Sequence, residues 1–271
     1  MPAFVPGLYG ASYLTKFMTA ETTTPPAAPA QASGPLFYRQ PLPLQSDKHA
    51  NWRLRPGSLA FAAETNAIPA VIGEFGMAAQ HFPILFTGQD ASPIVAVGLA
   101  RRNLFVTDGK WADDTYAPAY LRRYPFVFVQ AEDDNFLLAL DADSEQVNQG
   151  VSDEGEPLFV DGKATELVDN AMKFCADFTR EYEQTRQFSA ALKEQDLLVE
   201  RSIDVTLPSG EKMSVNGFHV VDVEKFAKLP DAIVLAWHRN GWLASIHHHL
   251  SSLARFNALV QRQSAQVAAA A

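Results

Sequence analysis

The amino-acid sequence predicts an α+β fold in which a mostly antiparallel sheet is packed by a long helix and a C-terminal helix. Three observations support this prediction. The first half of the chain holds short β-rich runs separated by Gly, Pro and Asp, the second half holds a long stretch without Gly or Pro, and one hairpin follows that stretch. Closely spaced short strands without long intervening helices are typical of antiparallel or mixed sheets rather than of repeated βαβ units.

The predicted strands of the first half lie between residues 36 and 162. They are the runs FPILFTG, PIVAVGLA, NLFVTDG, PFVFVQ and FLLALDA. Two helices are predicted among them, one over about 65–81 and a short one over 117–124. The first half therefore supplies most of the sheet.

A long helix is predicted over residues 165–198. Neither Gly nor Pro interrupts this stretch, and apolar residues recur near a 3.6-residue period from Leu167 to Leu192. A hairpin follows, because Ile203, Val205 and Leu207 alternate with polar residues before the turn sequence PSGE.

The C-terminal part is predicted to be helical. A short helix over 223–229 leads to Pro230, which suits the first position of a last helix that reaches about Gln263, and Gly241 marks a bend near its start. We expect one domain over 36–263, because the late hairpin returns to the same core. Residues 1–35, rich in Ala, Pro and Thr, are expected to form a disordered arm, and 264–271 a loose tail.

Composition and charge exclude several classes of protein. The chain of 271 residues has a net charge of −9 and no basic stripe, so nucleic acid is not an expected partner. No apolar run approaches the roughly 20 residues that span a bilayer, and the start lacks the pattern of a signal peptide. A soluble, cytoplasmic protein is therefore expected, with surface association through signal-independent export left open. The single cysteine, Cys175, is expected to be buried and inert.

The most conspicuous motif is the histidine triple His247, His248 and His249. Consecutive side chains on a helix point about 100° apart, so the three cannot ligate one metal ion. A metal site would need further ligands such as His219, Asp222 or His49. Packing and hydrogen bonding at the helix edge is the favoured interpretation.

A second motif, the acidic run from Asp141 to Glu145, follows the predicted strand FLLAL. It does not continue as a calcium-binding loop, because Gln146 and Ser152 replace the required glycine and glutamate. A metal clamp made by Asp141 and Asp143 is one interpretation, and a solvated turn is the favoured one.

Two segments have the aromatic and guanidinium groups that suit a binding surface, one over residues 116–126 and one over 49–53. Nucleophile-elbow, Walker and dinucleotide-binding motifs are absent from the sequence. The sequence leaves the cofactor unknown. The candidate ligand-binding residues are His49, Trp52, Arg53, Tyr120, Arg122, Arg123, His219 and His238.

These segments, taken with three others, resemble the bacterial SapC family. The matching stretches are FYRQPLPLQSDKHANWRLRPG, TNAIPAVIGEF, YAPAYLRRYPF, GFHVVDVEKFAKLPDA and RNGWLASIHHHLSSLARF. They occur in the family's order and cover about 36–260. The resemblance implies a role related to bacterial surface layers, from which the family takes its name, and it supplies no catalytic residues.

Two classes of function are left open by the sequence. The first is a non-catalytic binding or assembly protein, with a protein or small-molecule partner or a second copy of the chain. The alternative is a small intracellular enzyme or pathway accessory with a pocket lined by His, Asp and Arg, in which a metal is one option. If the candidate residues gather in one concave pocket, ligand binding or catalysis is favoured; if they scatter and apolar side chains face solvent, assembly is favoured.

Overall fold

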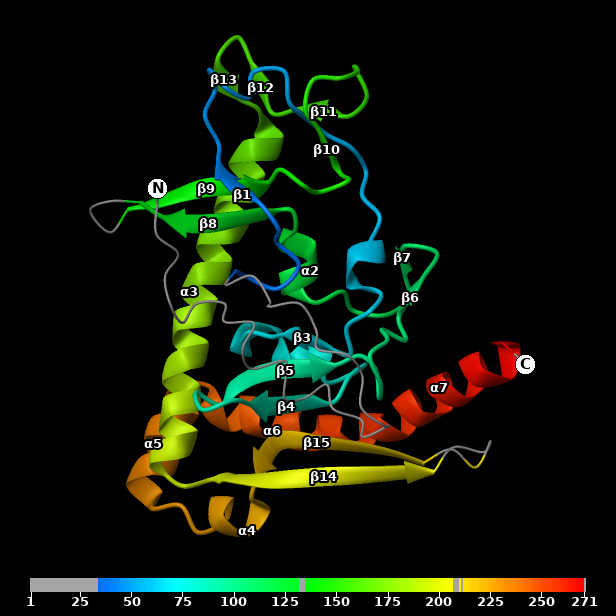
Figure 1. The fold of residues 1–271 in the computed structure, drawn as a ribbon. Coiled ribbons are helices and arrows are strands. Elements are labelled where there is room, and N and C mark those ends of the chain that lie inside the picture. Colours follow the sequence, from blue (N-terminus) through cyan, green and yellow to red (C-terminus); the bar gives the residue numbers. More distant parts are fainter. Residues whose placement is uncertain (1–33, 132–134, 207–209, 211, 271) are drawn as a thin grey trace.

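The computed structural model describes residues 34–131, 135–206, 210 and 212–270. The α+β prediction is confirmed: antiparallel sheets are packed by the long helix α3 and by helices at the C-terminal end (Figure 1). The expected arm lies outside the described residues, apart from its last two. The hairpin turn PSGE also lies outside them, apart from Gly210.

The large sheet has five strands, and each strand pairs antiparallel with its neighbours. In spatial order they are β14 (Leu198–Thr206), β15 (Lys212–Val221), β4 (Ile84–Thr87), β5 (Ser92–Ala96) and β3 (Ala67–Pro69). All four residues of β4 are buried, which fits three consecutive apolar residues, followed by Thr87, at the centre of the sheet. The late hairpin therefore does join strands from the first half.

The remaining strands form four smaller sheets. One has the order β1 (Pro41–Pro43), β9 (Phe136–Asp141) and β8 (Phe126–Gln130), and another the order β10 (Val147–Asn148), β2 (Arg53–Leu54) and β11 (Glu156–Pro157). Two pairs complete the set, β12 (Phe159–Val160) with β13 (Lys163–Ala164) and β6 (Val106–Thr107) with β7 (Lys110–Trp111).

Helix α3 (Glu166–Glu194) runs past both the three-stranded β1–β9–β8 sheet and the large sheet (Figure 1). Its 29 residues correspond to about 43 Å. The first half of α3 places Val168 and Cys175 in a hydrophobic cluster with the inner face of β8 and β9. The second half places Phe188 and Leu192 in the main core with the large sheet. One helix thus supplies side chains to both clusters.

The predicted last helix is wrong in one respect, because the structure breaks it into three helices. These are α5 (Asp231–Arg239), α6 (Trp242–Ser252) and α7 (Phe256–Ala270), after the short α4 (Val223–Phe226). Gly241 has a φ of 76°, a left-handed conformation that ends α5, and the 3-10 turn η6 (Leu253–Arg255) separates α6 from α7. Residues 264–270, predicted as a loose tail, are helical.

The predicted helix over 65–81 is also wrong over its first half. Residues 67–69 form β3, and only the turn η4 (Ile72–Glu74) and the helix α1 (Phe75–Ala78) are helical, after an earlier turn η3 (Ala60–Ala62). Pro69 lacks the amide proton that a helix interior requires, and Gly73 and Gly76 weaken the helical alternative further. The short helix α2 (Ala119–Arg123) is confirmed.

No helix in the described part of the chain is both long enough and apolar enough to cross a bilayer.

Candidate functional site

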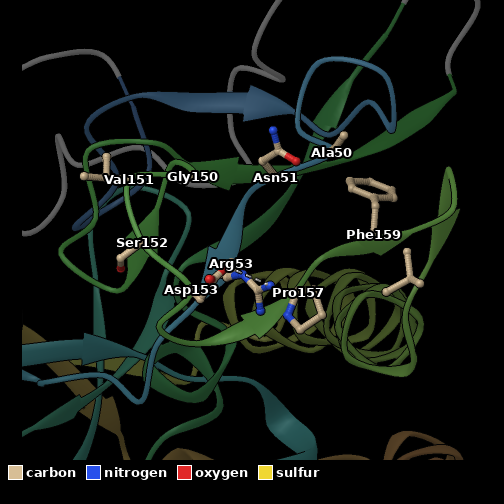
Figure 2. Close-up of a pocket in the computed structure, with 10 residues that line it drawn as sticks. Ala50, Asn51, Arg53, Gly150, Val151, Ser152, Asp153, Pro157 and Phe159 are labelled. Atoms are coloured by element: carbon tan, nitrogen blue, oxygen red, sulfur yellow. Dashed lines mark hydrogen bonds and ion pairs between the residues drawn. The ribbon is translucent and has the colours of Figure 1, made fainter.

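The candidate site is a hollow of about 470 Å³ around Arg53, at the end of the molecule where β2, β10, β11 and β12 meet (Figures 1 and 2). Figure 2 shows Arg53 beside Asp153 at its centre, with Val151 and Phe159 on opposite sides. The residues that line the hollow are Ala50, Asn51, Arg53, Gly150, Val151, Ser152, Asp153, Pro157, Phe159 and Val160. We call it the Arg53 hollow.

One wall of the Arg53 hollow is the loop over residues 149–155, and Asn148 holds its shape. Only 2% of Asn148 is exposed, and its Nδ2 donates to the carbonyl oxygens of Ser152 at 2.7 Å and Glu154 at 2.9 Å. Its Oδ1 accepts from the amide of Val151 at 3.0 Å. A side chain bonded at both ends in this way fixes a loop that has no regular structure of its own.

Gly155 allows the loop to lie directly against β2. Its φ is 99°, and a Cβ added there would lie 2.6 Å from the carbonyl oxygen of Leu54. Any other residue would be strained by the backbone angle and would also push β2 away. The close approach brings the carbonyl of Gly155 within reach of Arg53.

Arg53 is fixed in orientation while part of it still faces solvent. Its Nη1 donates to the carbonyl oxygen of Gly155 at 3.1 Å, and its Nη2 lies 3.5 Å from Oδ1 of Asp153. The side chain of Arg53 is 29% exposed, whereas that of Asp153 is fully exposed at 103%. A pair with one fully hydrated partner is weak, so another carboxylate can replace Asp153 at little cost.

The rim of the Arg53 hollow is apolar. Val151 is 89% exposed and Val160 is 53% exposed, which is unusual for β-branched aliphatic residues. Phe159 stands between the rim and the hydrophobic cluster beneath it. A guanidinium surrounded by exposed apolar groups can bind a complementary surface by charge and by burial together.

His49 and Trp52, two predicted site residues, precede Arg53 in the chain and are not among the residues that line the hollow. His49 is 7% exposed, its Nδ1 accepts from the amide of Gln45 at 2.9 Å, and its ring contacts that of Trp52 with centroids 4.4 Å apart. Burial is the main cause that lowers the pKa of His49. Both residues therefore anchor the segment that carries Arg53.

The predicted residues on α2 lie elsewhere, in an aromatic part of the core. Arg123 is 3% exposed, and its guanidinium lies over the rings of Tyr120 and Phe178, 4.7 Å and 4.4 Å from their centroids. Its Nε donates to the hydroxyl of Tyr38 at 3.3 Å. A guanidinium can pack against several aromatic faces in this way, and the arrangement holds α2 in place.

Arg122, in contrast, is exposed and belongs to a chain of polar contacts. Its Nη2 donates to the hydroxyl of Tyr116 at 3.0 Å, and that hydroxyl donates to Oε2 of Glu74 at 2.9 Å. Oε2 of Glu74 also accepts from the amide of Ala119 at 2.8 Å, and Oε1 accepts from that of Val71 at 2.9 Å. The carboxylate therefore joins η4 to α2.

Sequence reasoning did not identify Glu74. Its position three residues after Val71 matches the spacing of a helix capping box and was the available signal. Burial raises the pKa of Glu74, and burial also raises the pKa of the Tyr116 hydroxyl to about 12. Since main-chain donors occupy both carboxylate oxygens, we interpret Glu74 as a structural group.

Asp141 is neither a solvated turn residue nor part of a metal clamp, so both sequence interpretations of it are wrong. It is fully buried, whereas Asp143 is exposed. Oδ1 of Asp141 accepts from the amide of Gln40 at 2.7 Å, and Oδ2 accepts from the amide of Arg39 at 3.2 Å and from the hydroxyl of Tyr124 at 3.0 Å. The carboxylate ties the segment before β1 to the end of β9.

His219 and His238, the other two predicted residues, lie on different elements, β15 and α5. His219 lies on β15 opposite Phe86 and Glu200, and its buried Nδ1 has no hydrogen-bond partner within the described ranges. His238 is exposed on α5. The eight predicted site residues therefore do not converge on one pocket.

The predicted packing and hydrogen bonding of the histidine triple apply to one of its three members. His247 and His248 are exposed, whereas His249 is fully buried and hydrogen-bonded between β15 and β4. Within the ranges that the structure describes, no three His, Cys, Asp or Glu side chains are grouped to hold a metal ion. Cys175 is buried as expected, and burial raises the pKa of its thiol to about 11.

A second, shallower hollow of about 630 Å³ lies between α3 and the β8–β9 hairpin. Its floor is the stacked pair Phe128 and Phe136, with centroids 6.1 Å apart, and Phe136 is 44% exposed. The other lining residues, all from α3, are Ala176, Thr179, Arg180, Glu183, Gln184 and Gln187.

Comparison with known proteins identifies a family. The family model described as SapC matches residues 44–259. The chain belongs to the SapC family. No curated protein and no solved structure matches it. The match to SapC covers the whole Arg53 hollow, helix α2, the buried Glu74 and Asp141, and His249.

The structure gives a physical role to the SapC-like segments that the sequence singled out. Glu74 joins two of these segments, TNAIPAVIGEF and YAPAYLRRYPF. Its carboxylate belongs to the first segment and accepts hydrogen bonds from Tyr116 and Ala119 of the second. FYRQPLPLQSDKHANWRLRPG contributes Arg53 to the hollow and meets β9 at Asp141. These SapC segments therefore build the scaffold, and the first of them also reaches the candidate site.

Proposed function

We propose that this SapC family member is a non-catalytic binding protein that docks a protein partner at the Arg53 hollow as part of an assembly. The observation that carries the proposal is the state of Arg53. Its guanidinium is oriented by the carbonyl of Gly155 at 3.1 Å, is 29% exposed, and faces a hollow whose rim is apolar.

An oriented arginine is well suited to contribute binding free energy. Arginine is enriched among the interface residues whose truncation costs most, and orientation before binding reduces the entropy lost on contact. Asn148 and Gly155 hold the loop around Arg53 in the free protein. The site is therefore organised before a partner arrives.

The charges around the Arg53 hollow indicate the chemistry of the partner. Arg53 faces Asp153, and Arg55 faces Glu154, each at 3.5 Å. A partner carboxylate can replace the fully exposed Asp153 on Arg53, while apolar partner side chains cover Val151 and Val160. We infer a partner surface on which a carboxylate is flanked by apolar side chains.

The lining of the hollow favours binding over catalysis. Among the described residues that form it there is no histidine or cysteine, the side chains that most often act as a general base or a nucleophile. The buried acids and the buried imidazole elsewhere, Glu74, Asp141 and His249, accept hydrogen bonds from the main chain. The surface-layer context of the family name is consistent with an assembly role.

Site-directed photo-crosslinking in cells of the natural source tests the proposal. A photoreactive amino acid replaces Val151, which is 89% exposed at the rim, and the matched control position is Met77, which is 53% exposed on α1. We expect a discrete protein adduct from position 151, and we expect that adduct to be lost when Arg53→Ala is added. The same adduct should form in vitro when the purified partner is mixed with the purified protein.

Two results would overturn the proposal. One is an adduct pattern at position 151 that matches the control position or persists with Arg53→Ala. The other is an adduct with a glycan or a lipid in place of a protein.

A further inference from the structure

Helix α5 exposes most of its apolar side chains, although it has a strongly apolar sequence. Over the nine residues Asp231–Arg239, Trp237 is the fully buried side chain and Ile233 is partly buried. Val234 is 37% exposed and Leu235 is 51% exposed. Two turns of helix thus present aliphatic groups to solvent, a pattern that marks interaction surfaces.

The exposed face of α5 also has an ordered arrangement of charge. Asp231, Leu235 and His238 are spaced i, i+4 and i+7, so they share one face, with Val234 beside them. Asp231 is the acidic residue in the first turn, and His238 and Arg239 are the basic residues in the last turn. The face is therefore acidic at one end, apolar in the middle and basic at the other end.

We propose that two copies of the chain pair through this face of α5, antiparallel about a twofold axis. When the axis passes midway between Val234 and Leu235, Asp231 of each copy lies opposite the basic end of the other copy. That end is formed by His238 and Arg239. The same axis also places Val234 of each copy opposite Leu235 of the other. Every contact then occurs twice, as a closed twofold interface requires.

The occupant is a second copy because the face is complementary to itself. An antiparallel copy neutralises both charged ends and covers the apolar centre, whereas a parallel copy would oppose like charges. Ala232 and Ala236 are exposed on the flank of this face, and their small side chains permit close approach of two helices. No other partner is needed to satisfy the pattern.

The interface is distinct from the Arg53 hollow and is expected to be weak. Helix α5 lies at the end of the molecule opposite to β12 and β13 (Figure 1). A single pair of nine-residue helices, each about 13 Å long, buries less surface than a standard stable interface. We therefore expect a monomer–dimer equilibrium that shifts with protein concentration.

Sedimentation velocity of the full chain over roughly a hundredfold range of concentration measures this equilibrium. The wild type is expected to shift from monomer to dimer as its concentration rises. The Leu235→Asp variant is expected to have a dissociation constant at least roughly tenfold higher. Met172→Asp is the matched control, because Met172 is similarly exposed at 47% but lies in the first half of α3, outside both proposed surfaces, and it should leave the dimer unchanged.

A charge exchange separates pairing from the stability of the helix itself. Asp231→Lys should weaken the dimer, and adding Arg239→Glu should restore it. In the double variant a positive charge lies at the N-terminus of α5 and a negative charge at its C-terminus, and both oppose the helix dipole. The helix by itself should therefore be less stable in the double variant than in the wild type or in Asp231→Lys. Recovery of the dimer in the double variant thus supports pairing.

The proposal is overturned by a wild type that stays monomeric over the whole range, by a dimer that Leu235→Asp leaves intact, or by a double variant no stronger than Asp231→Lys. Each result leaves the crosslinking test at position 151 unaffected.

Discussion

The Nδ1 atom of His249 lies 2.8 Å from the carbonyl oxygen of Ile84, at the point where the pairing of β15 with β4 stops. The register of these strands would place Val221 opposite Ile84. The amide of Val221 instead donates to Nε2 of His249 at 3.0 Å. The imidazole, with its proton on Nδ1, therefore bridges the amide of Val221 and the carbonyl of Ile84.

Replacing His249 should destabilise the protein strongly. His249→Ala leaves the amide of Val221 and the carbonyl of Ile84 without the imidazole and creates a cavity at a fully buried position, with an expected cost of about 2 to 4 kcal/mol. The free energy of unfolding in urea measures it. His248→Ala is the matched control, since His248 is exposed, and should change stability by less than about 0.5 kcal/mol. Equal effects of the two substitutions would contradict the bridging role.

The same imidazole predicts a loss of stability in acid. Burial lowers the pKa of His249 from 6.5 to about 4, so the unfolded chain binds a proton at a higher pH than the folded chain does. The contribution of His249 is therefore complete above pH 6.5 and is lost as the pH falls toward 4. The loss amounts to about 3 kcal/mol.

Unfolding of the wild type and of His249→Ala at a series of pH values separates this contribution from the others. Their difference in free energy of unfolding should shrink between about pH 7 and about pH 4. Protonation of Glu74 changes the stability in the opposite direction. Because burial raises the pKa of Glu74, its contribution to the free energy of unfolding is lost as the pH rises through the pKa of the folded protein. A constant difference between the two proteins would show that His249 does not titrate as the structure requires.

Asn148 should control the order of the Arg53 hollow. Asn148→Ala removes the contacts to Val151, Ser152 and Glu154, at an expected cost of about 1 to 3 kcal/mol. Amide hydrogen exchange over residues 149–155 should become faster. Asn51→Ala, an exposed change on the wall of the same hollow, should leave exchange in the loop unchanged. Unaltered exchange in Asn148→Ala would mean that other contacts hold the loop.

Cys175 should be unreactive in the folded protein. The thiol is 1% exposed, and burial, the larger cause, raises its pKa to about 11 against the lowering effect of Arg123. Labelling with a chromogenic disulfide should be slow in native buffer and complete in denaturant. Labelling at the same rate under both conditions would be inconsistent with the buried position.

The sequence predicted the elements whose patterns are local and long. Helix α3, the β14–β15 hairpin and the burial of Cys175 depend on periodicity and composition, and each is confirmed. The break at β3 was missed, because Pro69 acts at a single position within an otherwise helical pattern. Gly241 was recognised from the sequence as a bend, but not as the end of one helix and the start of another.

The candidate site was predictable only in part. Arg53 was identified from its aromatic and basic surroundings, but the wall over 149–155 comes from a segment about one hundred residues away, and Asn148 gave no signal. Asp141 and Glu74 were misread or missed for a related reason. Their partners, such as Gln40 and Ala119, are distant in sequence, and only the fold brings those main-chain amides to the carboxylates.

The shared helix has a thermodynamic consequence for the whole body. Since α3 gives Val168 and Cys175 to one cluster and Phe188 and Leu192 to the other, melting either cluster leaves the same helix with a bare apolar stripe. A helix that has lost the packing of its apolar face is only marginally stable in water. Heating should therefore dismantle both clusters together, as a single calorimetric peak in which helical signal and aromatic signal vanish at one temperature.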